Sequence, residues 1–185
     1  MTANGLHVVA CEKEITCGLD FKFDPDILGF VDMILGDNRD NLYVFDFKWT
    51  SSKNHYPDLL KKNGSLQLAL YHELVEKELG QKVAATAYYL MPENCLYSIH
   101  PFAGENTKQL EEEENQGNNL FLQIRNSYEY RRQQIADGII ELGESQLATD
   151  LQYVKDMEEK NLMPLRTRND MKEGNIFSDY TSFKQ

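Results

Sequence analysis

An acidic and a basic residue capable of chemistry lie close together at Asp46 and Lys48. They belong to residues 42–50, a run rich in aromatic and β-branched types that predicts a strand. Because alternate side chains of a strand leave the same face, the carboxylate and the ammonium are expected to share one neighbourhood. A surface ion pair is the other interpretation of this spacing. The opposite face is expected to pack in a core and carries Phe45, Phe47 and Trp49.

A second carboxylate, Asp32, lies in the middle of the apolar run 27–35. Burying it is costly unless hydrogen-bond donors or a cation compensate. If this run pairs with residues 42–50 through the polar turn 36–41, Asp32 and Asp46 face one another on neighbouring strands. Two close carboxylates repel each other, and a cation such as Mg²⁺ or Mn²⁺ would remove the conflict. Alternatively, Asp32 caps local backbone donors at a bulge.

A third polar pair, Gln67 and Tyr71, is spaced four residues apart. Leucines at helical spacing predict a helix over 65–79, with Ser65 as a candidate N-cap and Gly80 as the stop signal. Residues four apart on a helix lie on one face. The two side chains can therefore act together, although core packing is an alternative role for Tyr71.

The elements that must position these residues form an alternating series along the chain. We expect strands at 6–16, 82–91 and 95–99, a loop at 51–63 around Pro57, and helices at 119–140 and 147–159. This order predicts an α/β (α+β) domain with a mixed sheet. One domain, 1–185, is expected, with its core at about 6–140 and a helical and irregular C-terminal extension at 141–185.

The composition is that of a globular chain with 185 residues, of which 41% are hydrophobic. The chain lacks both a bilayer-length apolar run and an N-terminal signal pattern, which excludes a membrane role. Its three cysteines, too few and too scattered for a disulfide framework, favour the cytoplasm. Nineteen basic and thirty acidic residues give a net charge of −11, which argues against nucleic acid as a partner unless the acidity is local.

Taken together, Gly29-x-x-Asp32, Asp46-x-Lys48 and Gln67-x-x-x-Tyr71 resemble the PD-(D/E)XK nuclease superfamily in order and flanking residues. Within it, the Gln-x-x-x-Tyr signature resembles the RecB/AddB-like exonuclease branch. The segment Glu12-Lys13-Glu14 is similar to the acidic first-strand motif of that branch. The resemblance covers about residues 8–91 and implies a restriction-endonuclease-like fold, a mixed β-sheet core flanked by helices.

The resemblance also implies an activity, that of an Mg²⁺- or Mn²⁺-dependent DNA exonuclease in recombination or repair. Asp32 and Asp46 would hold metal, joined by the Phe47 backbone carbonyl and by Glu12, or Glu14 in its place. Lys48 would orient or activate the attacking water and stabilise charge on the phosphate. Gln67 and Tyr71 would position the DNA backbone or Lys48. Three lysines beside this site could meet DNA phosphates, namely Lys53, Lys61 and Lys62.

Two departures from the family pattern leave alternatives open. Active relatives usually carry a metal-binding histidine on a helix before the first strand, and His7 is too close to that strand to supply it. Many relatives also end in a cysteine cluster, whereas 174–183 holds no cysteine, so no iron–sulfur cluster is expected. The chain would then be a fragment of a longer nuclease, working with a helicase or a larger nuclease polypeptide. Otherwise it is an impaired nuclease fold for DNA-end binding or assembly, or a metal-free interaction module.

Overall fold

The computed structural model describes residues 5–21, 26–102, 105–111, 119–139 and 151–163. The chain divides into two compact units, Met1–Arg125 and Asn126–Gln185. Every residue expected to do chemistry belongs to the first unit. The tail 174–183 and the first residues of the helix expected at 147–159 lie outside the described residues.

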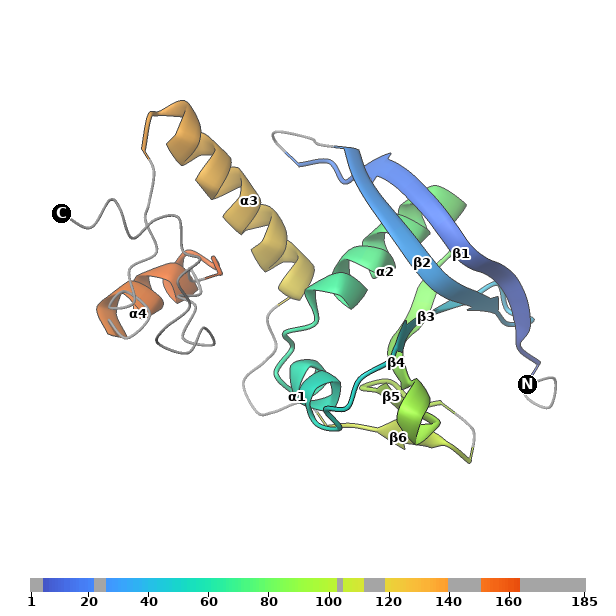
Figure 1. Ribbon diagram of the computed structural model, residues 1–185. Coiled ribbons are helices and arrows are strands. Elements are labelled where there is room, and N and C mark those ends of the chain that lie inside the picture. Colours follow the sequence, from blue (N-terminus) through green and yellow to red (C-terminus); the bar gives the residue numbers. More distant parts are fainter. Residues whose placement is uncertain (1–4, 22–25, 103–104, 112–118, 140–150, 164–185) are drawn as a thin grey trace. The chain divides into compact units, whose positions relative to one another are not determined.

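A six-stranded mixed sheet forms the centre of the first unit, in the order β1-β2-β3-β4-β5-β6 (Figure 1). The pairs β1–β2, β2–β3 and β4–β5 are antiparallel, whereas β3–β4 and β5–β6 are parallel. The expected mixed α/β (α+β) fold class is therefore confirmed. The strands are β1 (His7–Gly18), β2 (Asp26–Gly36), β3 (Leu42–Lys48), β4 (Val83–Leu90), β5 (Cys95–Ser98) and β6 (Thr107–Gln109).

Helices connect the two central parallel strands, because a parallel pair needs a crossover connection. Both α1 (His55–Lys61) and α2 (Leu66–Leu79) lie between β3 and β4 in the chain. The longer helix, α2, packs against β1, β2, β3 and β4 and so covers one face of the sheet (Figure 1). A short 3₁₀ turn, η2 (Met91–Glu93), joins β4 to β5.

The hairpin of β2 and β3 is confirmed, and Asp37 fixes its turn. The Asp37 carboxylate accepts the backbone N–H of Arg39 at 2.7 Å and that of Asn41 at 3.0 Å. Hydrogen bonds from the Asn41 side chain and backbone lower the pKa of Asp37 to about 2. A rigid turn fixes the register of the two strands that carry Asp32 and Asp46.

The expectation of a loop at 51–63 is wrong, because this range contains α1. Proline is tolerated in the first turn of a helix, where the backbone N–H has no intrahelical partner. Pro57 is the third residue of α1 and is buried, as is Leu60. Pro57 therefore lies at a position where a helix accepts proline.

The expected helix at 65–79 is confirmed with nearly the same ends. Gly80 has a φ of +66° and donates its N–H to the Glu76 carbonyl, which closes the last turn. Ser65 precedes the first helical residue but makes no side-chain capping bond. Its hydroxyl is used elsewhere, in a bond to Tyr88.

The expectation that Phe45, Phe47 and Trp49 all pack in the core is wrong for the last two. Phe45 is 5% exposed, whereas Phe47 is 36% and Trp49 81% exposed. The last pair between β3 and β4 is Lys48–Leu90. Trp49 therefore lies beyond the end of the strand, where alternation no longer directs a side chain into the core.

The second unit contains most of α3 (Leu120–Ala136) and all of α4 (Leu151–Glu159). Met157 and Leu162 are buried there, and the Met163 N–H donates to the Ser127 hydroxyl at 2.7 Å. Both helices were expected from the sequence. Among the described residues, no helix has the length and apolar character needed to cross a membrane.

Candidate active site

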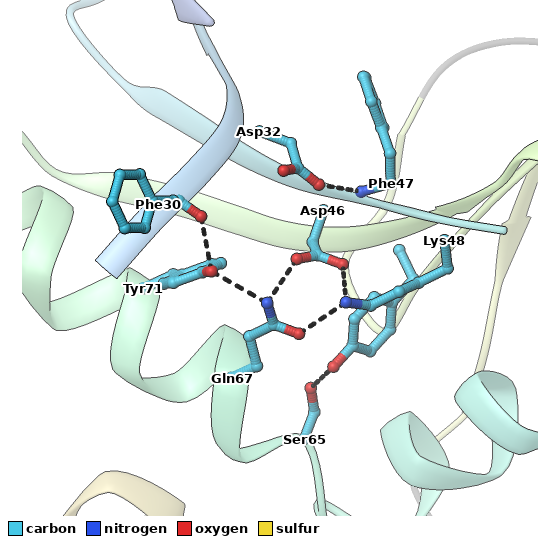
Figure 2. A network of polar contacts seen from close by, with 9 residues as sticks. Phe30, Asp32, Asp46, Phe47, Lys48, Ser65, Gln67 and Tyr71 are labelled. Atoms are coloured by element: carbon cyan, nitrogen blue, oxygen red, sulfur yellow. Dashed lines mark hydrogen bonds and ion pairs between the residues drawn. The ribbon is translucent and has the colours of Figure 1, made fainter. Parts of the chain in front are cut away.

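The centre of the candidate site is the ion pair between Asp46 and Lys48 on β3 (Figure 2). Asp46 is 2% exposed, and its Oδ2 lies 2.6 Å from the Lys48 Nζ. Among the described residues, the Lys48 ammonium is the polar partner of this buried oxygen. The expected same-face placement is thus found, with Asp46 buried and Lys48 half-buried rather than both on the surface.

Gln67 on α2 joins both members of this ion pair. Its Nε2 donates to the Asp46 Oδ1 at 2.6 Å, and its Oε1 accepts from the Lys48 Nζ at 2.8 Å. The same Nε2 also donates to the Tyr71 hydroxyl at 2.9 Å. One amide therefore ties the carboxylate and the ammonium of β3 to the helix.

Tyr71 extends the network to β2. Its hydroxyl donates to the Phe30 carbonyl at 2.6 Å. A Cβ at Gly29 would come within 3.3 Å of the Tyr71 ring and 3.2 Å of Leu74. The small residue of the Gly29-x-x-Asp32 motif therefore provides the room in which the tyrosine lies against β2.

Asp32 lies where the pairing of β2 with β3 ends, one residue before the Met33–Phe45 pair. Its Oδ2 accepts the backbone N–H of Phe47 at 2.6 Å. Asp32 thus satisfies a backbone donor, as in the capping alternative, but the donor lies on the neighbouring strand β3 rather than at a local bulge. Figure 2 shows the Asp32 carboxylate turned to this amide, while the Asp46 carboxylate turns to Lys48 and Gln67.

The electrostatics of Asp46 favour a neighbouring cation. Burial raises the pKa of its carboxyl, Lys48 lowers it through its hydrogen bond and its charge, and the negative charge of Asp32 raises it further. The two carboxylates therefore interact, as expected for neighbouring strands. A second positive charge beside them would offset the cost of keeping Asp46 ionised.

Two tyrosines that no sequence motif indicates lie close to Lys48. Its Nζ lies 5.6 Å from the centre of the Tyr56 ring and 5.7 Å from that of Tyr88. The Tyr88 hydroxyl bonds the buried Ser65 hydroxyl at 2.6 Å, and burial raises the pKa of Tyr88 to about 12. Tyr88 is the β4 partner of Asp46, a pairing that only the register of the parallel strands provides.

Glu12 is not grouped with the two aspartates. It lies on β1 between the Cys11–Met33 and Lys13–Val31 pairs, with a φ of +47° and an exposed side chain. In the described part of the chain, no three acidic, histidine or cysteine side chains form a group that could hold a metal ion. Glu14 is exposed as well.

The remaining predicted residues are Phe47 and the three lysines expected to meet DNA. Phe47 contributes its amide N–H to Asp32, and the role of its carbonyl stays a prediction. The three lysines lie in and around α1. Lys53 precedes the helix and is exposed, Lys61 is its last residue and is half-buried, and Lys62 follows it and is exposed.

The donor set fits a hard divalent cation. Carboxylate oxygens are the ligands that Mg²⁺ and Mn²⁺ prefer, and a carboxylate accepts through two oxygens. Asp46 offers the buried Oδ2, whose partner is the Lys48 ammonium, and Asp32 has Oδ1 besides the atom engaged by Phe47. Asp32 and Asp46 would hold the ion.

Comparison with known proteins does not assign the chain to a family. No protein-family model matches the chain, and no curated protein matches it.

Proposed function

We propose that the chain is a metal-dependent DNA exonuclease domain of the PD-(D/E)XK superfamily, in its RecB/AddB-like branch, acting in recombination or repair. The observation that carries the proposal is the network Asp46–Lys48–Gln67–Tyr71, in which four motif residues contact one another in series. Two separate sequence motifs that merely coincided would have no reason to form one network.

In phosphodiester hydrolysis, each of these groups would have its own role. A divalent cation held by Asp32 and Asp46 would neutralise phosphate charge and lower the pKa of water. The Lys48 ammonium would stabilise charge developing on the phosphate oxygens, or orient the water that attacks phosphorus. As the new P–O bond forms, the bond to the leaving oxygen breaks, and that oxygen takes a proton.

Gln67 and Tyr71 act on Lys48 rather than on the phosphate in this proposal. The Gln67 carbonyl holds the ammonium from the helix side while its amide holds Asp46. Because Tyr71 in turn bonds the β2 backbone, the lysine is held by groups from three elements. Such positioning lowers the reorganisation that the reaction requires.

A second function, DNA-end binding without catalysis, is favoured by one specific observation. Asp32 and Asp46 are engaged by different partners, the Phe47 amide and the Lys48–Gln67 pair. A site in which these contacts replace the metal would keep the fold and the basic residues but lose hydrolysis.

A nuclease assay separates the two functions. We expect purified chain to degrade linear single- or double-stranded DNA with Mg²⁺ or Mn²⁺, and EDTA to abolish the activity. Asp46→Ala and Lys48→Ala should each lower the rate by at least 10²-fold, as typical for loss of an electrostatic group. Glu12→Ala tests the metal role expected for that exposed residue, and Glu105→Ala, on an exposed residue with no expected role, is the control.

Activity that persists unchanged in Asp46→Ala and Lys48→Ala would refute the active-site assignment. DNA binding without metal-dependent cleavage by the wild-type chain would favour the second function. A loss in Glu12→Ala as large as in Asp46→Ala would instead return Glu12 to the metal site.

A further inference from the structure

Trp49, the only tryptophan of the chain, faces solvent directly beside the candidate active site. It is 81% exposed, the largest exposure among the large hydrophobic residues of the described chain. Tryptophan is well buried on average, because leaving its large apolar ring in water is costly. A ring this exposed is available to a flat ligand.

The position of Trp49 is fixed by its neighbours on β3. It follows Lys48, and adjacent Cα atoms are about 3.8 Å apart. Lys48 itself is held by Asp46 and Gln67. Two residues earlier, the Phe47 ring packs against Tyr89 with ring centres 5.6 Å apart. The exposed indole therefore projects from a segment whose backbone is anchored in the sheet.

The chain around Trp49 is positively charged although the protein is acidic. We call residues 49–62 the basic segment, because they hold three lysines and one acidic residue, for a net charge of +2. The rest of the chain therefore carries a net charge of −13, which together with the +2 gives the total of −11. A positive segment that begins with an exposed aromatic ring is complementary to a strand of phosphates and bases.

We propose that Trp49 is a stacking platform for a base of single-stranded DNA whose phosphates contact the lysines of the basic segment. This inference deepens the proposed function, on which it rests, by naming the substrate form. Bases in a duplex are already stacked on their neighbours, whereas an unpaired base offers its face to an aromatic side chain. Every base has such a face, so stacking on Trp49 would select single-stranded DNA without selecting a particular sequence.

The intrinsic fluorescence of the single tryptophan tests the stacking directly. The wild-type chain is titrated in EDTA, where hydrolysis cannot occur, with a short oligothymidylate, an abasic strand of equal length and a blunt duplex of equal length. We expect the oligothymidylate to quench Trp49 saturably. The abasic strand should bind through its phosphates but leave the fluorescence nearly unchanged.

Variants then separate the aromatic face from simple apolar bulk. Binding of a labelled oligothymidylate is followed by anisotropy for Trp49→Tyr, which keeps a ring, and Trp49→Leu, which does not. Because stacking on one base is worth about 1–3 kcal/mol, Trp49→Leu should weaken binding about 5- to 150-fold. Trp49→Tyr should stay close to wild type. A neighbouring exposed position, Ser51→Ala, controls for disturbance of the loop.

The outcomes support or overturn the inference without depending on catalysis. Base-dependent quenching together with weaker binding by Trp49→Leu supports it, even if no metal-dependent cleavage is found and the nuclease proposal fails. Equal quenching by the abasic strand, wild-type affinity in Trp49→Leu, or binding of the duplex alone overturns it, and the exposed ring would then suit a protein partner.

Discussion

Gln67 can hold only one amide orientation in this site. Its oxygen faces the Lys48 ammonium and its nitrogen faces the Asp46 carboxylate. If the amide were reversed, a nitrogen donor would face an ammonium and an oxygen would face a carboxylate, and both contacts would become repulsive. Glutamine is therefore the residue type that joins an acid and a lysine across one site.

The buried hydroxyl pair of Ser65 and Tyr88 gives a prediction at the same scale. Tyr88→Phe keeps the ring beside Lys48 but leaves the Ser65 hydroxyl, on a residue 7% exposed, without its partner. We expect the free energy of unfolding to fall by about 1–3 kcal/mol, measured by urea unfolding.

The double-mutant cycle with Ser65→Ala is the control for this prediction. If the two hydroxyls act through their mutual bond, the double variant should cost less than the sum of the single variants, by about 0.5–3 kcal/mol. Strict additivity would mean that each hydroxyl matters for a separate reason.

At the scale of elements, the site depends on how closely α2 lies against β2. Gly29 is the point of close approach, because the Tyr71 ring and Leu74 occupy the space that a side chain would fill. Tyr71 then reaches the Phe30 carbonyl. Gly29 therefore affects the site indirectly, because it allows α2 to pack closely on β2.

Gly29→Ala tests this fit. The added Cβ would lie 3.2 Å from Leu74 and 3.3 Å from the Tyr71 ring, so both must shift. Overpacking of this kind typically costs about 1–3 kcal/mol of the free energy of unfolding. We also expect the nuclease rate to fall, because Tyr71 supports Gln67.

The adjacent substitution Leu28→Ala is the matched control for Gly29→Ala. Leu28 is on the same strand but 55% exposed, so its loss should change the free energy of unfolding by less than about 0.5 kcal/mol. Similar effects from both substitutions would show that the strand, rather than the contact with α2, is responsible.

At the scale of the whole molecule, the acidity is unevenly distributed. A net charge of −11 opposes DNA binding, but residues 49–62, which directly follow Lys48 in the chain, carry +2. We therefore expect weak affinity that depends strongly on salt, with metal ions or a larger polypeptide supplying further positive charge.

The salt dependence of single-stranded DNA binding measures this local charge. If Lys53, Lys61 and Lys62 each meet a phosphate, the logarithm of the binding constant should fall against the logarithm of salt with a slope of about −2. Changing all three to glutamine should flatten the slope towards zero. Lys82→Gln, at the opposite end of β4 from the Lys48–Leu90 pair, should leave it unchanged.

The prediction of local elements from the sequence was accurate where one periodicity ran without interruption. The strands of the hairpin, α2 and β4 were all expected close to their observed ends. The elements that were not predicted are those whose structure depends on position within an element or on distant segments rather than on a local sequence pattern. Pro57 is compatible with α1 only because it falls in the first turn, and β6 is too short to show a period.

The sequence by itself determined the mixed fold class and the residue types of the site, because spacing alone puts Asp46 with Lys48 and Gln67 with Tyr71 on shared faces. Only the tertiary structure decided which of these faces meet. Packing of α2 on the sheet brought Gln67 between Asp46 and Lys48, and parallel register brought Tyr88 beside them. The end of strand pairing left Trp49 in solvent, because what covers a side chain is set by distant segments rather than by its neighbours in the chain.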